Sequence, residues 1–442
     1  MRKRGQMELF QPTAPPVDAG IEERIVNNHM HVNQSTFKGG LASRFHRWFR
    51  LTPSFGPELV QHVLTEFRAG PDSVVLDPFA GAGTTLIECK TEDLEAYGFE
   101  INPFLHFVGQ TSLRWIVDSP AIRERFRSVE NAFRNKREQL DGVPVDQCAL
   151  PIPPIHNVYR WWRHDVLKDL LILRASVDEV LANEPTVRDF FRLAIAGVLV
   201  PDLTNVTLGR LQLHFIDRSN DDMDVWRTFE KHTEAMIDDL DAASAQPQTK
   251  QQRAYLTDAT GVRAQDYDWR ADVVITSPPY PNRYSYVWNT RPHLYFFDFF
   301  HGKTEAADLD KKTIGGTWGT ATSILTKGVV KPAFPIIGDV VEPVASKIRD
   351  SDNLMANYLM KYFNLLARQI VSMDPLLKPR AQAAYVVGNS ELKGIYVETD
   401  VLLGKVFEGL GLGYKVGSIE RFRRRHSGKD LFETTVYARK GG

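Results

Sequence analysis

The sequence of 442 residues contains only two cysteines, Cys89 and Cys148, and no long apolar run. Two cysteines cannot build a disulfide framework or a cysteine-based zinc site, and such scarcity is typical of a reducing compartment. No apolar run approaches the length of about 20 residues that a membrane-spanning helix needs. The basic N-terminal segment MRKRGQMELFQPTAPP is not followed by the apolar core of a secretion signal. We therefore expect a soluble, cytoplasmic protein without membrane association.

The chain also lacks an excess of either charge, since 54 Lys and Arg residues face 55 Asp and Glu residues. The molecule as a whole then exerts little attraction on a polyanion, so a nucleic acid would have to be bound through a local basic patch. The two histidines of NNHMH (residues 27–31) have no acids or cysteines at ligand spacing, and we assign no metal.

What the sequence does contain is an alternation of short apolar strands with helices. The residue patterns predict strands at 73–77, 96–100, 253–258, 272–276, 383–387, about 414–420 and 431–438. Residues 73–100 read as strand, glycine-rich turn, helix and strand, a unit whose strands pair in parallel. The fold class that follows is α/β, with a doubly wound sheet.

Between the first two and the remaining strands lies a long stretch of helical periodicity. We predict a loosely structured N-terminal arm at 1–45, a first part of the core at 46–112, a helical insertion at 113–252, and a second part of the core at 253–442 with a long loop at about 300–350. The insertion either recognises a target or braces the core. Its segment VYRWWRHD (158–165) opens an amphipathic helix, which favours packing over a basic, aromatic DNA surface.

Four polar side chains fall at the carboxyl ends of predicted strands, namely Asp77, Glu100, Asp258 and Ser277. Ligands of doubly wound sheets bind at this edge, close to the point where the strand order reverses. We therefore expect the functional site to contain these four residues.

The segment LDPFAGAGTT (76–85) indicates a nucleoside cofactor. Gly81 and Gly83 allow close backbone approach, and Thr84 and Thr85 open a helix. Asp77 directly before the glycines would repel a pyrophosphate and suits a cationic ligand. With Glu100 placed for ribose hydroxyls and Asp258 for an adenine amino group, the set describes S-adenosylmethionine better than a dinucleotide. The alternative is that each acid caps a strand-to-helix turn.

The segment TSPPY (276–280) ends an apolar strand with two residues that have no N–H group. The Pro278 carbonyl and the Ser277 hydroxyl are therefore available to accept hydrogen bonds from an amine, and Tyr280 offers a ring on which a flipped base can stack. The alternative is a strand that simply ends in Pro-Pro beside a packed tyrosine.

Together, DPFAGAGTT and TSPPY resemble the motifs of the amino-methyltransferase group of DNA methyltransferases, which modify exocyclic base nitrogens. Ala82 stands where the family usually has serine, and the match covers about 46–112 and 253–440. The resemblance implies a Rossmann-like class I methyltransferase fold with a seven-stranded sheet and S-adenosyl-L-methionine as cofactor. The implied cofactor contacts are Phe55, Asp77, Phe79, Gly81, Gly83, Thr84, Thr85, Glu100, Asn102, Asp258 and Ala259, and the implied catalytic residues are Ser277, Pro278, Pro279 and Tyr280.

The resemblance also suggests a reaction. Serine in the first position of the Pro-Pro motif favours cytosine N4 over adenine N6, while methylation of an RNA base amine and an inactive binding module remain open. The expected partner is double-stranded DNA with its target base flipped, in a restriction-modification or phage-defence setting with a companion nuclease or other defence proteins. The oligomeric state is left open.

Two segments supply candidate DNA contacts. One follows the Pro-Pro motif directly and contains Arg283, Tyr284 and Tyr286; the other, RFRRRHSGK (421–429), contains Arg423, Arg424 and Arg425. Core packing is the alternative for the first segment, and a solvated hairpin tip is the alternative for the second.

Overall fold

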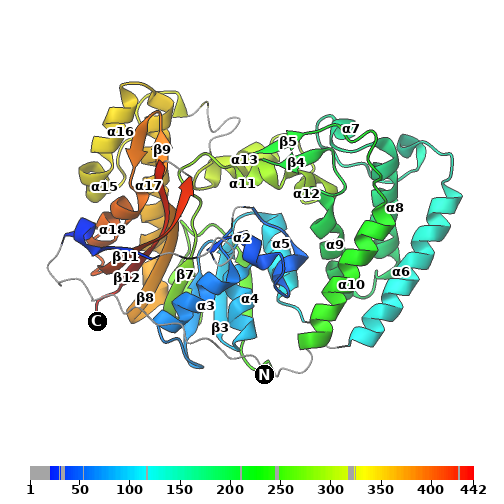
Figure 1. Ribbon diagram of the computed structural model, residues 1–442, viewed down its shortest axis with the longest axis horizontal. Coiled ribbons are helices and arrows are strands. Elements are labelled where there is room, and N and C mark those ends of the chain that lie inside the picture. The colour runs from blue at the N-terminus through cyan, green and yellow to red at the C-terminus, as the bar shows by residue number, and fades with distance from the viewer. Residues whose placement is uncertain are drawn as a thin grey trace.

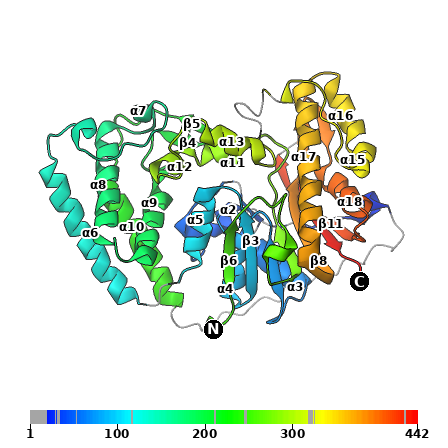
Figure 2. The ribbon, with the colours of Figure 1, turned by 180° about the vertical axis from the view of Figure 1, so that it is seen from behind.

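The protein is seen here as a computed structural model in which an eight-stranded sheet lies beside a group of long helices (Figures 1 and 2). The structure describes residues 20–28, 30, 35–52, 54–115, 118–209, 212–243, 248–316, 323, 325–426 and 429–442. Within these residues, none of the helices is both long and apolar enough to cross a lipid bilayer.

All seven strands predicted from the sequence belong to the sheet. Its members, in spatial order, are β1 (Ile25–Asn27), β11 (Lys415–His426), β12 (Lys429–Arg439), β8 (Leu377–Gly388), β7 (Ala271–Thr276), β2 (Val74–Asp77), β3 (Glu95–Glu100) and β6 (Gln252–Leu256). Strands β8, β7, β2, β3 and β6 pair in parallel, whereas β12 is antiparallel to both of its neighbours. The chain builds outward from β2 to β6 and then returns to β7 on the other side of β2, so the strand order reverses between β2 and β7.

The sheet is buried on both faces, as its parallel strands require. Along β2, Val75 contributes to one hydrophobic cluster, and Val74 and Leu76 contribute to the other. Helices α3 (Pro57–Glu66), α4 (Thr84–Thr91) and α5 (Pro103–Ser112) pack with the first cluster, and α17 (Asn353–Met373) and α18 (Thr399–Gly409) pack with the second. This layering leaves the carboxyl ends of β2, β3, β6 and β7 at one edge of the sheet.

The helical part of the chain extends the first of these clusters. It consists of α6 (Ser119–Gln139), α7 (Val158–Trp161), α8 (His164–Val180), α9 (Pro185–Leu199), α10 (Val225–Ala243) and a hairpin of β4 (Val206–Leu208) and β5 (Leu213–Phe215). Trp48 meets Phe190 of α9 edge to face at 5.5 Å between ring centroids, so the two parts share one core. Trp161 and Trp162 are buried, which confirms the packing interpretation for these two residues. Their neighbours Tyr159 and Arg160 are exposed.

The N-terminal arm differs from the expectation. Residues 25–27 form β1, which pairs in parallel with β11 and makes the sheet eight-stranded. Ile21 is buried against the same core, and Arg24 donates to Glu408 at 2.7 Å. A strand of three residues has too little periodicity to be detected in a polar sequence, and residues 1–19 lie outside the described part.

The long loop expected at about 300–350 is also a correction, because its described residues include three helices. These are α13 (Glu305–Lys312), α15 (Pro335–Val340) and α16 (Glu342–Arg349). Pro335 and Pro343 each lie in the first turn of a helix, where a missing N–H group costs nothing.

Candidate active site

The turn after β2, here called the glycine turn (Pro78–Gly83), has the backbone that its glycines permit. Gly81 and Gly83 have φ angles of 54° and 91°, in the left-handed region that other residues avoid. A Cβ atom on Gly83 would lie 3.2 Å from Cα of Gly109 in α5. The turn therefore needs glycine for conformation and for close packing, and α4 begins directly after it at Thr84.

Glu100, at the end of β3, organises this turn. Its Oε2 accepts from the backbone N–H of Gly81 at 2.9 Å, and its Oε1 accepts from that of Asn102 at 2.7 Å. Burial raises the pKa of the Glu100 carboxyl to about 7. Each carboxylate oxygen keeps a further lone pair, so the group can still accept from a ligand hydroxyl.

Asp77 lies behind the glycine turn and is only 1% exposed. Its Oδ1 accepts from Thr276 Oγ1 at 2.5 Å and from the Phe79 N–H at 3.0 Å. Burial raises the pKa of its carboxyl to about 6. The side chain links the ends of β2 and β7 and does not face the cavity described below. The sequence had predicted that Asp77 contacts a cationic ligand directly, and its position differs from that prediction.

The turn after β7, here called the proline turn (Ser277–Tyr280), is held by the neighbouring strand and by α17. The Ser277 hydroxyl donates to the Val386 carbonyl of β8 at 3.2 Å. The Tyr358 hydroxyl of α17 accepts from the Arg283 N–H at 3.1 Å and donates to the Tyr280 carbonyl at 3.5 Å. The turn is therefore fixed from both sides.

The two turns face a common hollow, here called the strand-end cavity. Its lining includes these predicted site residues: Phe55, Phe79, Gly81, Thr84, Glu100, Asn102, Asp258, Ala259, Ser277, Pro279 and Tyr286. Asp258 stands just beyond β6 and accepts through Oδ1 from the N–H and the hydroxyl of Thr260, at 2.9 and 2.8 Å. Residues from four strand ends, separated by up to 200 positions in the sequence, thus meet at the reversal point of the sheet.

Other predicted residues lie near the cavity without lining it, namely Asp77, Gly83, Thr85, Pro278, Tyr280, Arg283 and Tyr284. Thr85 is fully buried and donates to the Ile275 carbonyl at 3.4 Å. Tyr284 is buried and donates to the Thr52 carbonyl, and burial raises its pKa. Tyr280 is 9% exposed, so the ring expected to stack on a base is covered, whereas Tyr286 does line the cavity.

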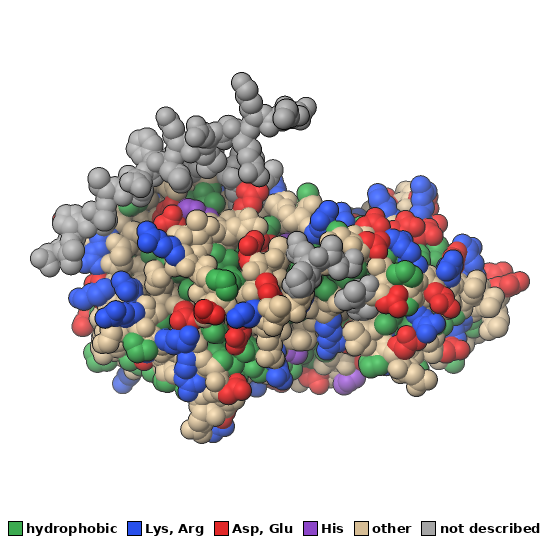
Figure 3. Space-filling view, turned by 90° about the horizontal axis from the view of Figure 1, so that it is seen from below, with side chains coloured by type: hydrophobic (Ala, Val, Ile, Leu, Met, Phe, Trp, Pro, Cys, Tyr) green, Lys and Arg blue, Asp and Glu red, His purple; other side chains and the backbone are tan. Residues whose placement is uncertain are grey.

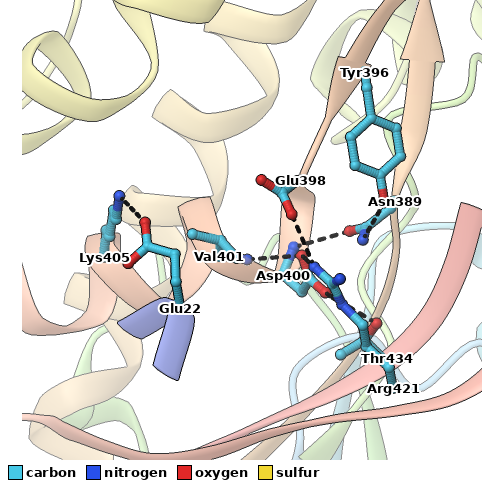
Figure 4. Close-up of polar contacts among 9 residues, drawn as sticks. All are labelled: Glu22, Asn389, Tyr396, Glu398, Asp400, Val401, Lys405, Arg421 and Thr434. Carbon is cyan, nitrogen blue, oxygen red and sulfur yellow. Dashed lines mark hydrogen bonds and ion pairs between the residues drawn. The ribbon is translucent and has the colours of Figure 1, made fainter. Parts of the chain in front are cut away.

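The basic segment near the C-terminus differs from the expectation of free cations at a hairpin tip. Strand β11 runs on to His426, and Arg423 within it pairs with Glu433 of β12, Nη2 to Oε2, at 2.5 Å. Arg421 pairs with the buried Asp400 at 2.8 Å and with Glu398 at 3.0 Å, in the polar cluster of Figure 4. The side chains of Arg424 and Arg425 lie outside the described part. This part of β11 was not predicted because arginine is not among the residues enriched in strands.

Several residues of the site were not found from the sequence. Thr290, in the segment after the proline turn, accepts through Oγ1 from Nδ2 of the predicted residue Asn102 at 2.9 Å. The region expected to be a loop also lines the cavity, through Lys312, Thr313 and Ile314. Tyr358 lies in an apolar helix, where an aromatic residue normally signals core packing. No local motif marks any of these contacts.

The cavity lining suits a nucleoside better than a metal ion. Acceptors stand at Glu100 and Asp258, and apolar side chains such as Phe79, Ile101 and Leu105 lie on the same lining. Within the described residues, no group of three His, Cys, Asp or Glu side chains is arranged to hold a metal.

Comparisons with known proteins agree with the motifs. A family model described as DNA methylase matches residues 31–108. The Type II methyltransferase M.MvaI of Kocuria varians is 21% identical over 389 residues, covering 85% of this chain and 81% of that protein. The Type II methyltransferase M.AvaI of Nostoc sp. is 22% identical over 424 residues, covering 85% of this chain and 80% of that protein.

Likeness to solved structures is weaker: the crystal structure of TrmN from Thermus thermophilus covers 90% of this chain and 53% of that chain, with 10% identity and a TM-score of 0.31. The fold of the present chain is Rossmann-like on its own topology, with parallel strands reversing beside β2. Its motifs and the relatives that span most of its length support a likeness to the amino-methyltransferase group of DNA methyltransferases.

Proposed function

We propose that this protein is a methyltransferase that uses S-adenosyl-L-methionine to methylate the 4-amino group of cytosine in double-stranded DNA. The observation that carries the proposal is the hydrogen bond from the Ser277 hydroxyl to the Val386 carbonyl. A serine hydroxyl has one proton, and here that proton is used within the protein. The Ser277 oxygen at the cavity therefore acts as an acceptor, and an amine is the group that donates to it.

The cofactor is proposed from the chemistry of the cavity lining. Glu100 has acceptor capacity left for ribose hydroxyls, and Asp258 uses only Oδ1 in its bonds to Thr260, which leaves Oδ2 for an adenine amino group. The glycines of this turn let the backbone approach the cofactor closely, because no side chain stands between the two. When bound, S-adenosyl-L-methionine supplies a methyl group made reactive by its positively charged sulfur.

The role of the proline turn is to bind and orient the base amine. The lone pair of an exocyclic amine is delocalised into the ring, so the nitrogen is a poor nucleophile. Two acceptors, the Ser277 oxygen on the cavity lining and the Pro278 carbonyl beside that lining, would hold its hydrogens and set its direction, a contribution of positioning and electrostatics. Neither proline has an N–H group that would repel the amine.

The choice of cytosine N4 rests on Ser277 through the family resemblance, and duplex DNA is the substrate class that the relatives' group suggests. We propose a role in restriction-modification or a similar defence, with a nuclease as companion, because both full-length relatives are named Type II methyltransferases. The target base would be flipped out to reach the strand-end cavity.

The test is methyl transfer from tritiated cofactor to duplex DNA, to tRNA and to a blank, followed by mass spectrometry of the nucleosides from the product. N4-methylcytosine in duplex DNA is the expected result. N6-methyladenine as the only product would reject cytosine, and label in tRNA alone would reject DNA. Binding of the cofactor without transfer to any substrate would indicate a binding module.

A further inference from the structure

A second hollow lies where the helical part of the chain meets the segment that follows the proline turn. It has a volume of about 450 Å³ and receives side chains from α7, from the β4–β5 hairpin and from α11 (Tyr286–Asn289) and α12 (Arg291–Phe296). These elements lie together at the top of Figure 1, and the reverse view agrees (Figure 2). Here called the arginine hollow, it is lined by Arg160, Trp161, Gln212, Leu213, Phe215, Trp288 and Arg291.

Cations and aromatic rings alternate in the arginine hollow. The guanidinium carbon of Arg291 lies 4.6 Å from the ring centroid of Trp161 and 4.5 Å from that of Trp288. Arg160 lies 3.9 Å over Phe215, whose ring meets Trp161 edge-on at 4.8 Å. Phe215 is 36% exposed, and no acid stands among the described residues that line the hollow. Such a lining attracts a group that is both flat and negatively charged.

Arg291 differs from two other half-buried arginines of this chain, which are paired with acids. Arg192 pairs with Asp178 at 2.7 Å, and Arg421 pairs with Asp400 at 2.8 Å. In the part of the chain that the structure describes, no carboxylate pairs with Arg291, and its Nε and the Nε1 of Trp288 are buried without an acceptor. Burial also lowers the pKa of Arg291 to about 10. Buried donors of this kind are normally satisfied, which points to an acceptor brought by a ligand.

The arginine hollow is coupled to the strand-end cavity by the short helix α11. Tyr286 lines the cavity and Trp288, two residues later, lines the hollow. Two residues of chain span at most about 7 Å, and successive nucleotides of a DNA strand are spaced by about 3.4 Å. A base held in the cavity would thus have its neighbours in the strand within reach of the hollow.

We propose that the arginine hollow binds a nucleotide of the DNA that flanks the target base and contributes to the choice of target sequence. The partly exposed rings of Phe215 and Trp288 supply a stacking surface for the flanking base, and Arg160 lies at the exposed rim, where it meets the phosphate. This inference rests on the proposed function. DNA is favoured over a protein partner because the hollow combines two cations with aromatic rings and adjoins the catalytic cavity. On the opposite side of the molecule, acidic and basic side chains are interspersed (Figure 3).

The test compares Arg160→Ala with a matched control, Arg253→Ala. Arg253 is also exposed and lies 4.7 Å over an aromatic ring, that of Tyr255, but it belongs to β6 and lines neither site. The site methylated by the wild type is first found by modification-sensitive sequencing, and kinetics are then measured on duplexes with that site and randomised flanks. Phe215→Leu serves as a second variant at the hollow.

For Arg160→Ala we expect about a tenfold rise in KM for the duplex, with kcat and cofactor affinity unchanged and a weaker preference at the positions beside the target base. Phe215→Leu should weaken the same preference, and Arg253→Ala should behave as the wild type. If the wild type methylates DNA but both hollow variants keep its KM and preference, the inference is overturned and the function stands. The inference is likewise overturned if the two hollow variants keep wild-type kinetics on DNA and lose only the binding of a protein partner. If the wild type does not act on DNA, both fall.

Discussion

The two turns of the strand-end cavity solve opposite problems in hydrogen bonding. The glycine turn, with φ angles of 54° at Gly81 and 91° at Gly83, keeps its backbone N–H groups, and Glu100 accepts that of Gly81. The proline turn has no N–H group at its two central positions, and the Ser277 hydroxyl donates its hydrogen bond to the Val386 carbonyl. One turn therefore uses a backbone donor to hold a carboxylate in place, whereas the other lacks donors at its two central positions and leaves acceptors there.

This difference shows how residue type at a turn sets what the turn can bind. Glycine adds conformational freedom and keeps its donor, whereas proline fixes the backbone and removes the donor. The turns are joined by the bond from Thr276 to Asp77, so they are positioned as one unit. Experiments that alter the hydrogen-bonding groups of each turn separately test this difference.

The largest effect is expected from Ser277→Ala, which removes a side-chain acceptor from the proline turn. We expect kcat for methyl transfer to fall by about 10²-fold, the scale found when one preorganised hydrogen-bonding group is removed from an active site. Cofactor affinity should change little, because the glycine turn is untouched. Single-turnover transfer and equilibrium cofactor binding measure the two quantities.

The matched control is Ser372→Ala. Ser372 also donates from a half-buried position to a distant backbone carbonyl, that of Val262 at 2.9 Å, but it lies in α17 away from the cavity. It should share a stability cost of about 1 kcal/mol and keep wild-type kcat. Equal kcat values for the two variants would show that Ser277 is only a structural strand end.

The contrast between the turns was largely visible in the sequence. Strands β2, β3, β6 and β7 were predicted because each is a short apolar run that ends at a polar residue or a turn signal. The cavity residues Glu100, Asp258 and Ser277 followed, because parallel strands bring their carboxyl ends together. The local residue pattern and the sheet topology are therefore enough to predict these strands and the polar residues at their ends.

The remainder depended on contacts that no local pattern records. Tyr358 reaches the proline turn across 78 residues, and Asn102 reaches Thr290 across 188. Arg423 was expected to be free, but its partner Glu433 is set by the register of a hairpin whose tip had been placed too early. Burial is also invisible at this level, so Asp77 was expected to face a ligand although it is 1% exposed.

A second, smaller effect is expected at the glycine turn. Because the pKa of Glu100 is raised to about 7, its carboxyl is partly protonated at neutral pH. Ribose hydroxyls donate better to the ionised form, so cofactor affinity should rise as pH increases through 7 and level off about one unit higher. Calorimetric titrations between pH 6 and pH 9 measure this dependence.

Glu100→Gln tests the assignment. It should weaken cofactor binding by about 10- to 100-fold, the range for bonds to a charged group, partly because the amide has one acceptor for the two N–H groups of Gly81 and Asn102. It should also flatten the pH profile, since the titrating group is gone. An unchanged slope in the variant would assign the titration to another residue.

The smallest effect is expected from Asp77→Asn, which tests the link between the two turns. The folded pKa of Asp77, about 6, lies above its ordinary value of 3.8, so the folded chain holds this proton more tightly than the unfolded chain. The resulting stability is complete below pH 3.8 and is lost as pH rises through 6. Asparagine keeps an oxygen for Thr276 and does not titrate. Relative to wild type, the variant should gain roughly 1–3 kcal/mol of unfolding free energy between pH 4 and pH 8, measured by denaturant unfolding without cofactor. If the difference in unfolding free energy between variant and wild type does not change with pH, the pKa of Asp77 is the same in the folded and unfolded chains. Asp77 would then be solvated and free to face a ligand. In that case the ligand, and not the Thr276 bond, would join the two turns.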